Sequence, residues 1–154
     1  TPPVYDVLIG QPKSPEPPAP SDFSKVAEME AMSPEERKAF WEKQFSRCFR
    51  CYACRQICFG CYCQECFVDR LDPEWVGIRV APDQNQMWHT IRAFHLAGRC
   101  ISCDECQRAC PVEIPLSLLN RKLEKETMGM FDHRAGMSAE PPAPLATFKP
   151  EELE

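Results

Sequence analysis

The sequence CFRCYACRQICFGCYC, residues 48–63, places six cysteines within sixteen positions. A second and sparser group, CISCDECQRACP, follows at residues 100–111. Both groups contain the spacing C-x2-C-x2-C-x3-C, which falls on Cys48, Cys51, Cys54 and Cys58 and again on Cys100, Cys103, Cys106 and Cys110. An ordinary hydrophobic core does not contain sulfur at this density, so these side chains are candidate metal ligands.

The composition of the chain limits the class of protein to which these cysteines can belong. The chain has 154 residues, which predicts one domain with extensions, and its net charge of -5 gives no general attraction to nucleic acid or anionic lipid. Eleven cysteines is an odd count, and the start, TPPVYDVLIG, lacks the features of a signal peptide. No stretch approaches the roughly 20 apolar residues of a membrane helix. We therefore expect a soluble, cytoplasmic protein in a reducing compartment, where clustered cysteines usually bind metal.

The spacing of the two runs predicts iron–sulfur binding. Runs of this kind hold [4Fe–4S] clusters in bacterial ferredoxins, where three cysteines bind one cluster and the fourth binds the other. Cluster one is then expected to use Cys48, Cys51, Cys54 and Cys110. Cluster two is expected to use Cys100, Cys103, Cys106 and Cys58. Zinc is the main competitor, because C-x2-C pairs also bind zinc, but zinc ribbons normally use separated pairs rather than triple runs.

Three further cysteines, Cys61, Cys63 and Cys66, lie in the sequence GCYCQEC. One interpretation is a third metal site, for zinc or a further iron–sulfur cluster, with His89, His95 or a partner's residue as fourth ligand. A second is a closed four-thiolate site that includes Cys58, and a third is a set of free thiols around cluster one. Each histidine by itself is first expected to be an ordinary packed or solvated side chain. The spacing does not identify the metal.

Composition also divides the chain. Residues 1–32 are expected to form an extended arm, because seven prolines occur among the first 20 residues and proline suits neither sheet nor helix interiors. Residues 33–131 are expected to form the iron–sulfur domain, with an insertion at 67–99. Residues 132–154 are again proline-rich and are expected to be an extended tail. Both ends are candidates for contacts with neighbouring proteins.

Local patterns predict the regular elements. Apolar periodicity and capping signals predict helices over residues 34–47, 86–98 and 114–129. Ser33 and Glu36 form a capping box at the start of the first helix, and Gly98 suits the end of the second. The segment WVGIRV, residues 75–80, is a candidate short strand. The aromatic residues Phe40, Trp41 and Phe45 are expected to pack against the first cysteine run.

These runs resemble the 2[4Fe–4S] ferredoxin-like domain over about residues 45–128. The segments SRCFRCYACRQICFGCYCQECFVD and HLAGRCISCDECQRACPVEIPLSLLNRKLEKE are similar to ferredoxin-type subunits that occur with heterodisulfide-reductase-like, hydrogenase or formate dehydrogenase modules in anaerobes. The resemblance implies an α+β, ferredoxin-like dicluster core with added helices and proline-rich arms. One departure is Phe59, which follows Cys58 where such runs commonly have proline, as Pro111 follows Cys110.

The function expected from these features is electron transfer. We find no G-x-G-x-x-G after a strand, no phosphate loop and no serine–histidine–acid arrangement, so we do not expect an enzyme. The chain is expected to relay single electrons between other subunits of an oxidoreductase complex, themselves flavin or iron–sulfur proteins. The alternatives are a zinc-binding structural or interaction module and a small catalytic centre at Cys61, Cys63 and Cys66.

Overall fold

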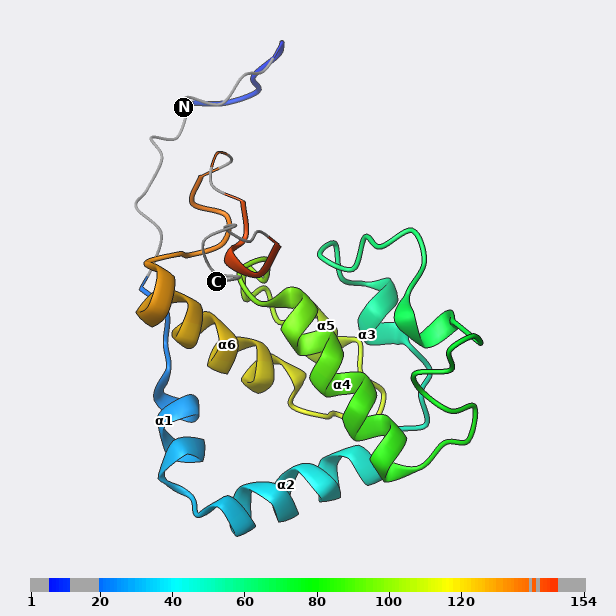
Figure 1. Cartoon of the computed structure of the whole chain (residues 1–154). Coiled ribbons are helices and arrows are strands. Elements are labelled where there is room, and N and C mark those ends of the chain that lie inside the picture. Colours follow the sequence, from blue (N-terminus) through cyan, green and yellow to red (C-terminus); the bar gives the residue numbers. More distant parts are fainter. Residues whose placement is uncertain (1–5, 12–19, 139, 141, 147–154) are drawn as a thin grey trace, which may run out of the picture.

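The structure, a computed structural model, describes residues 6–11, 20–138, 140 and 142–146 (Figure 1). Its helices are α1 (Ser24–Ala31), α2 (Pro34–Ser46), α3 (Ala53–Gln56), η1 (Phe67–Asp69), α4 (Pro82–Leu96), α5 (Glu105–Arg108), α6 (Leu116–Phe131) and η2 (Pro144–Ala146). Helix α4 packs against α2 and α6, while the short helices α3 and α5 pack against each other. Figure 1 shows α4 running between α6 and α3. None of the helices in the described ranges has the length and apolar character that a bilayer crossing requires.

The expected α+β fold class is wrong, because the described residues contain helices and no strand. The candidate strand at residues 75–80 is an irregular segment. A half-buried strand would bury Val76 and Ile78 on one face, yet Val76 is 3% exposed and Ile78 is 82% exposed. Side chains satisfy the backbone here: Gly77 donates to Gln84 Oε1 at 2.6 Å, and its carbonyl oxygen accepts from Arg50 Nη1 at 2.7 Å. The alternating apolar residues therefore belong to a loop that supports the first cysteine run.

Helix α2 forms as its capping signals predict. Ser33 Oγ accepts from the Glu36 amide at 3.2 Å, and Glu36 Oε2 accepts from the Ser33 amide at 2.8 Å. Trp41 stacks on Phe45, and Phe45 stacks on His89 with ring centroids 5.0 Å apart. The buried core that contains Phe45 also contains Cys54 and Cys106, and Trp41 packs against it. The expected packing beside the first cysteine run is therefore confirmed for Trp41 and Phe45, while Phe40 contacts Trp41 edge-on.

Helices α4 and α6 confirm the two longer predictions, with shifted ends. Helix α4 begins at Pro82 rather than at residue 86, because proline suits the first turn of a helix. It ends at Leu96, and Gly98, at φ +70°, turns the chain toward Cys100. Helix α6 continues two residues beyond Gly129, to Phe131.

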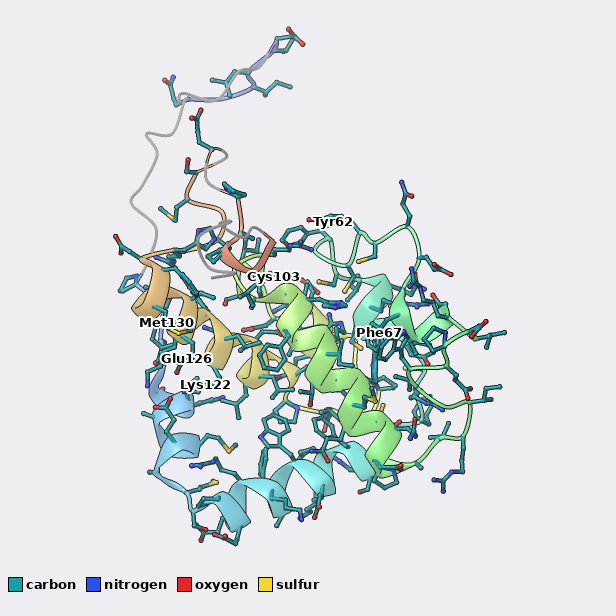
Figure 2. The ribbon with its side chains drawn as sticks, viewed as in Figure 1. Tyr62, Phe67, Cys103, Lys122, Glu126 and Met130 are labelled. Atoms are coloured by element: carbon teal, nitrogen blue, oxygen red, sulfur yellow. The ribbon has the colours of Figure 1, made fainter. Side chains whose placement is uncertain are left out.

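Helix α1 lies inside the segment assigned to the N-terminal arm. Glu30 at its end accepts from Lys122 Nζ on α6 at 2.6 Å and also pairs with Lys125. Lys122 also pairs with Glu126, one turn further along α6 (Figure 2). The remaining predictions for the arms fall largely on residues 1–5, 12–19, 139, 141 and 147–154, which lie outside the described residues.

Candidate metal centre

The two cysteine runs share one backbone conformation, offset by 52 residues. Arg50 (φ 53°) corresponds to Ser102 (φ 56°), and Tyr52 (φ 59°) corresponds to Asp104 (φ 62°). Each run then enters a four-residue helix, α3 or α5. Left-handed backbone at non-glycine residues is uncommon, so its recurrence at matching positions shows that the two runs are bent in the same way.

The exposure of the thiols repeats as well. The middle cysteines, Cys51 and Cys103, are both exposed, whereas Cys54 and Cys106 are both buried at 7%. The first and fourth cysteines of both runs are half-buried. Each run therefore presents one thiol to solvent and turns the others inward.

Two hollows collect the eight cysteines in crossed groups. The first is lined by the thiol-bearing residues Cys48, Cys51, Cys54 and Cys110. The second is lined by Cys100, Cys103, Cys106 and Cys58. Each hollow thus gathers three cysteines of one run and the fourth of the other, which is the grouping expected from the spacing. Phe59, which replaces proline after Cys58, also lines the second hollow and leaves Cys58 there.

Tertiary contacts hold the left-handed residues of both runs. In the first run, the Arg50 guanidinium donates to the carbonyl oxygens of Gly77 and Ile78, and Tyr52 packs edge-on against Trp88. In the second run, α6 provides the partners. Asp104 pairs with Arg121 at 2.9 Å, and Ser102 Oγ donates to the buried Glu124 carboxylate. These contacts offset the local cost of left-handed backbone.

Hydrogen-bond donors surround the sulfur atoms. The matching amides of Arg50 and Ser102 each lie 3.4 Å from the Sγ of the first cysteine in their run. Other donors to sulfur are the Ile114 amide to Cys110 at 3.4 Å and Asn120 Nδ2 to Cys106 at 3.6 Å. His89 Nε2 lies 3.3 Å from Cys48 Sγ and would donate to a thiolate there in the tautomer that carries its proton on Nε2. Donors at sulfur stabilise the anionic thiolates of a metal centre, so the arrangement fits an iron–sulfur cluster in each hollow.

A polar stripe on α4 faces the first run. Asn85 Nδ2 donates to the carbonyl oxygens of Phe45 and Cys48, at 2.9 and 2.7 Å. His89 contacts Cys48 as described above, and Arg92 Nη2 donates to the Cys54 carbonyl oxygen at 2.8 Å. The sequence analysis missed Asn85 and Arg92, and it considered His89 only as an ordinary side chain or as the fourth ligand of a third metal site. The available signal was their spacing of i, i+4 and i+7 on one helix face.

The environment of Arg92 indicates whether the hollows suit anionic groups. Its side chain is 4% exposed, and its Nε has no hydrogen-bond partner. The Cys54, Cys58, Cys61 and Cys106 sulfurs lie close enough to interact electrostatically with it. A buried guanidinium is costly unless enough anionic charge surrounds it, and protonated thiols supply none. The Cys58 thiol, whose pKa is lowered, is the exception. Metal-bound thiolates would supply that charge, so Arg92 fits metal in the hollows beside it.

Burial affects the acidity of the thiols. Desolvation raises the pKa of Cys54 and that of Cys100 to about 11. Cys58 is the exception, because a hydrogen bond with the Cys61 thiol lowers its pKa. The Cys54 and Cys100 thiols therefore carry protons at neutral pH until a metal displaces them.

The three remaining cysteines line a third hollow. Cys61, Cys63 and Cys66 share it with His95, whereas Cys58 lines the second hollow and His89 contacts Cys48. Within the described residues, no three His, Cys, Asp or Glu side chains are grouped as a site for a single metal ion.

No protein-family model matches this chain. The chain is 34% identical over 92 residues to the F420-dependent formate dehydrogenase subunit beta of Methanocaldococcus jannaschii, which covers 58% of this chain and 24% of that protein. It is 31% identical over 105 residues to the F420-dependent formate dehydrogenase 1 subunit beta of Methanococcus maripaludis, which covers 68% of this chain and 26% of that protein. Both relatives are formate dehydrogenase subunits. The chain spans about a quarter of the length of each. The expected likeness to such subunits is confirmed, while the number and type of clusters stay predictions.

Proposed function

We propose that this chain is the electron-transfer part of an oxidoreductase complex and binds two [4Fe–4S] clusters, one in each crossed hollow. Cluster one is held by Cys48, Cys51, Cys54 and Cys110, and cluster two by Cys100, Cys103, Cys106 and Cys58. The observation that carries the proposal is the crossed grouping of the cysteines in two hollows with matching backbone. When bound, the clusters would supply one-electron redox chemistry.

The chain's own residues prepare both sites. Trp88, Ile114 and Leu116 line the first hollow and exclude water on its inner side. Arg92, buried beside sulfurs of both hollows, balances the negative charge that thiolates bring. Cys51 and Cys103 are exposed, so each hollow has one side that a redox partner can approach.

Similarity to formate dehydrogenase beta subunits supports a role beside other subunits. We infer that flavin or iron–sulfur proteins of the same complex donate and accept the electrons, and that the chain itself binds no substrate. A cytoplasmic location is part of the same proposal.

Metal analysis tests the number and type of clusters. Protein purified and reconstituted anaerobically should contain about eight irons, with matching sulfide, in the two sites. It should also show the EPR signals of reduced [4Fe–4S] clusters. Colourless protein that holds only zinc would instead support the structural-module alternative.

Paired variants test the crossed ligation. Cys51→Ser and Cys110→Ser should alter the same EPR signal, because both residues line the first hollow. Cys103→Ser and Cys58→Ser should alter the other signal. Cys63→Ser should alter neither of these two signals, since Cys63 lines neither hollow. If Cys58→Ser instead altered the signal that Cys51→Ser alters, each run would hold its own cluster and the crossed assignment would be wrong.

A further inference from the structure

The loop at residues 60–67 is fastened around the last turn of α4. A Cβ on Gly60 would lie 2.9 Å from Leu96 Cδ2, so the backbone of the loop lies directly against the helix there. The Arg99 guanidinium lies 5.1 Å from the centre of the Tyr62 ring, just beyond the helix. Phe67 meets His95 edge-to-face with ring centroids 5.4 Å apart. Figure 2 shows Tyr62 and Phe67 on this part of the chain.

The fastened loop encloses a hollow that contains four metal-ligating side chains. Cys61, Cys63 and Cys66 come from the loop, and His95 comes from α4. The hollow has a volume of about 260 Å³ and opens to solvent on one side. Cys63 and His95 are exposed, so a metal ion can reach the site from outside.

The charges around this hollow favour anionic ligands. Arg55, Arg92 and Arg99 line it together with one carboxylate, Asp69, which is already paired with Arg55 at 2.7 Å. Arg92 is buried, and its Nε has no partner. Two guanidinium groups thus remain without a carboxylate in the lining, and metal-bound thiolates would provide the charge that they lack.

We propose that Cys61, Cys63, Cys66 and His95 hold a third metal centre, in which three thiolates and one imidazole bind a thiophilic metal. This donor set is typical of structural zinc sites and is also compatible with a small iron–sulfur cluster. Cys58 is not a ligand, because it lines the second hollow with Cys100, Cys103 and Cys106. Binding requires the loop thiols to move inward, since the described side chains are not grouped at single-ion spacing.

Metal content of matched variants tests the third site. The full chain and the triple variant Cys61→Ser, Cys63→Ser and Cys66→Ser are reconstituted anaerobically, one arm with iron and sulfide alone and one with equimolar zinc added. Mass spectrometry of the metals then counts iron and zinc per chain. We expect one metal centre more in the unaltered chain, found either as one zinc in the zinc arm or as iron beyond about eight in the iron arm.

Two histidine variants test the imidazole ligand. His95→Gln should weaken retention of the extra metal against a chelator, whereas His133→Gln should not, because His133 contacts the Gly98 carbonyl oxygen and lines none of the cysteine hollows. With Co²⁺ added to protein whose two iron–sulfur sites are already filled, the unaltered chain should retain one more Co²⁺ than the triple variant.

Equal metal content in the unaltered chain and the triple variant, in both arms, would overturn the third site. This inference is independent of the proposed relay. If neither the unaltered chain nor the triple variant contained about eight irons, the result would count against the relay. The third site is tested separately, by the difference in metal content between the two proteins.

Discussion

Individual residues in the two cysteine runs have different chemistry and the same conformation. Arg50 and Ser102 share a left-handed backbone, as do Tyr52 and Asp104, although none of the four is glycine. Each is held by a different partner from elsewhere in the chain. The conformation is therefore a property of the cysteine loop, and the side chains at these positions serve to fasten it.

His89 is expected to tune cluster one. Burial lowers its pKa to about 4, so the imidazole is neutral at pH 7, and its Nε2 lies 3.3 Å from Cys48 Sγ. A donor at sulfur stabilises the reduced, more negative cluster. His89→Leu should therefore lower the midpoint potential of cluster one, by about 40 mV if the bond strengthens by about 1 kcal/mol on reduction.

An EPR-monitored redox titration measures this shift. Asn120→Leu is the matched control, because Asn120 donates to Cys106 in the second hollow and its loss should shift only the other cluster. Unchanged potentials in His89→Leu would show that the contact does not bear on the cluster.

Among the elements, those with long apolar patterns or clear caps could be predicted from the sequence. Helices α2, α4 and α6 are of this kind. Helices α3 and α5 could not be predicted, because four residues are too few for periodicity, and each forms where a cysteine loop turns. Helix α1 was missed because neighbouring prolines suggested an extended arm. The prediction of a strand at residues 75–80 was wrong. Its alternating apolar residues belong to a loop whose carbonyl oxygens accept hydrogen bonds from Arg50.

Two glycines in or beside helices are expected to respond in opposite directions. Gly98 has φ +70° and would place a Cβ 2.8 Å from Pro144 Cδ, so Gly98→Ala should destabilise the protein by roughly 1–2 kcal/mol or more. Gly129 lies within α6 with open space around it, so Gly129→Ala should stabilise by about 0.5–1 kcal/mol. Apparent melting temperatures at one scan rate would show a fall and a rise respectively. A shift in the same direction for both would contradict the assigned role of Gly98.

The stability of the contact between α1 and α6 is expected to depend on the salt concentration. It is not expected to depend on pH near neutrality. Hydrogen bonds from Lys122 and Lys125 lower the pKa of Glu30 from 4.5 to about 2. Its stabilising contribution is therefore present above about pH 4.5 and is lost as the pH falls toward 2. Hydrogen exchange of the α1 amides should be faster in Glu30→Gln, and the difference from the unaltered chain should shrink in high salt. A difference that changed between about pH 6 and pH 8 would contradict this account.

At the scale of the whole molecule, the core lies between the cysteine hollows and the helices. Cys54 and Cys106 belong to that core, and Arg92 is buried among sulfurs. Without metal, most of the anionic charge around the buried cation is lost, and no cluster joins the two cysteine runs. We expect chelated, iron-free protein to lose most of its helical circular dichroism and to melt without cooperativity. A sharp thermal transition in iron-free protein would show that apolar packing alone maintains the fold.

The sequence by itself determined the kind of centre to expect, because the repeated cysteine spacing restricts which thiols can surround one cluster. It also determined the long helices, whose caps and apolar faces are local properties. Only the tertiary structure decided that the described core is helical and that Arg92 and His89 face the sulfurs. It alone brought His95 into one hollow with Cys61, Cys63 and Cys66. These outcomes depend on contacts between segments far apart in the chain, and no local pattern encodes which distant residue will fill a given space.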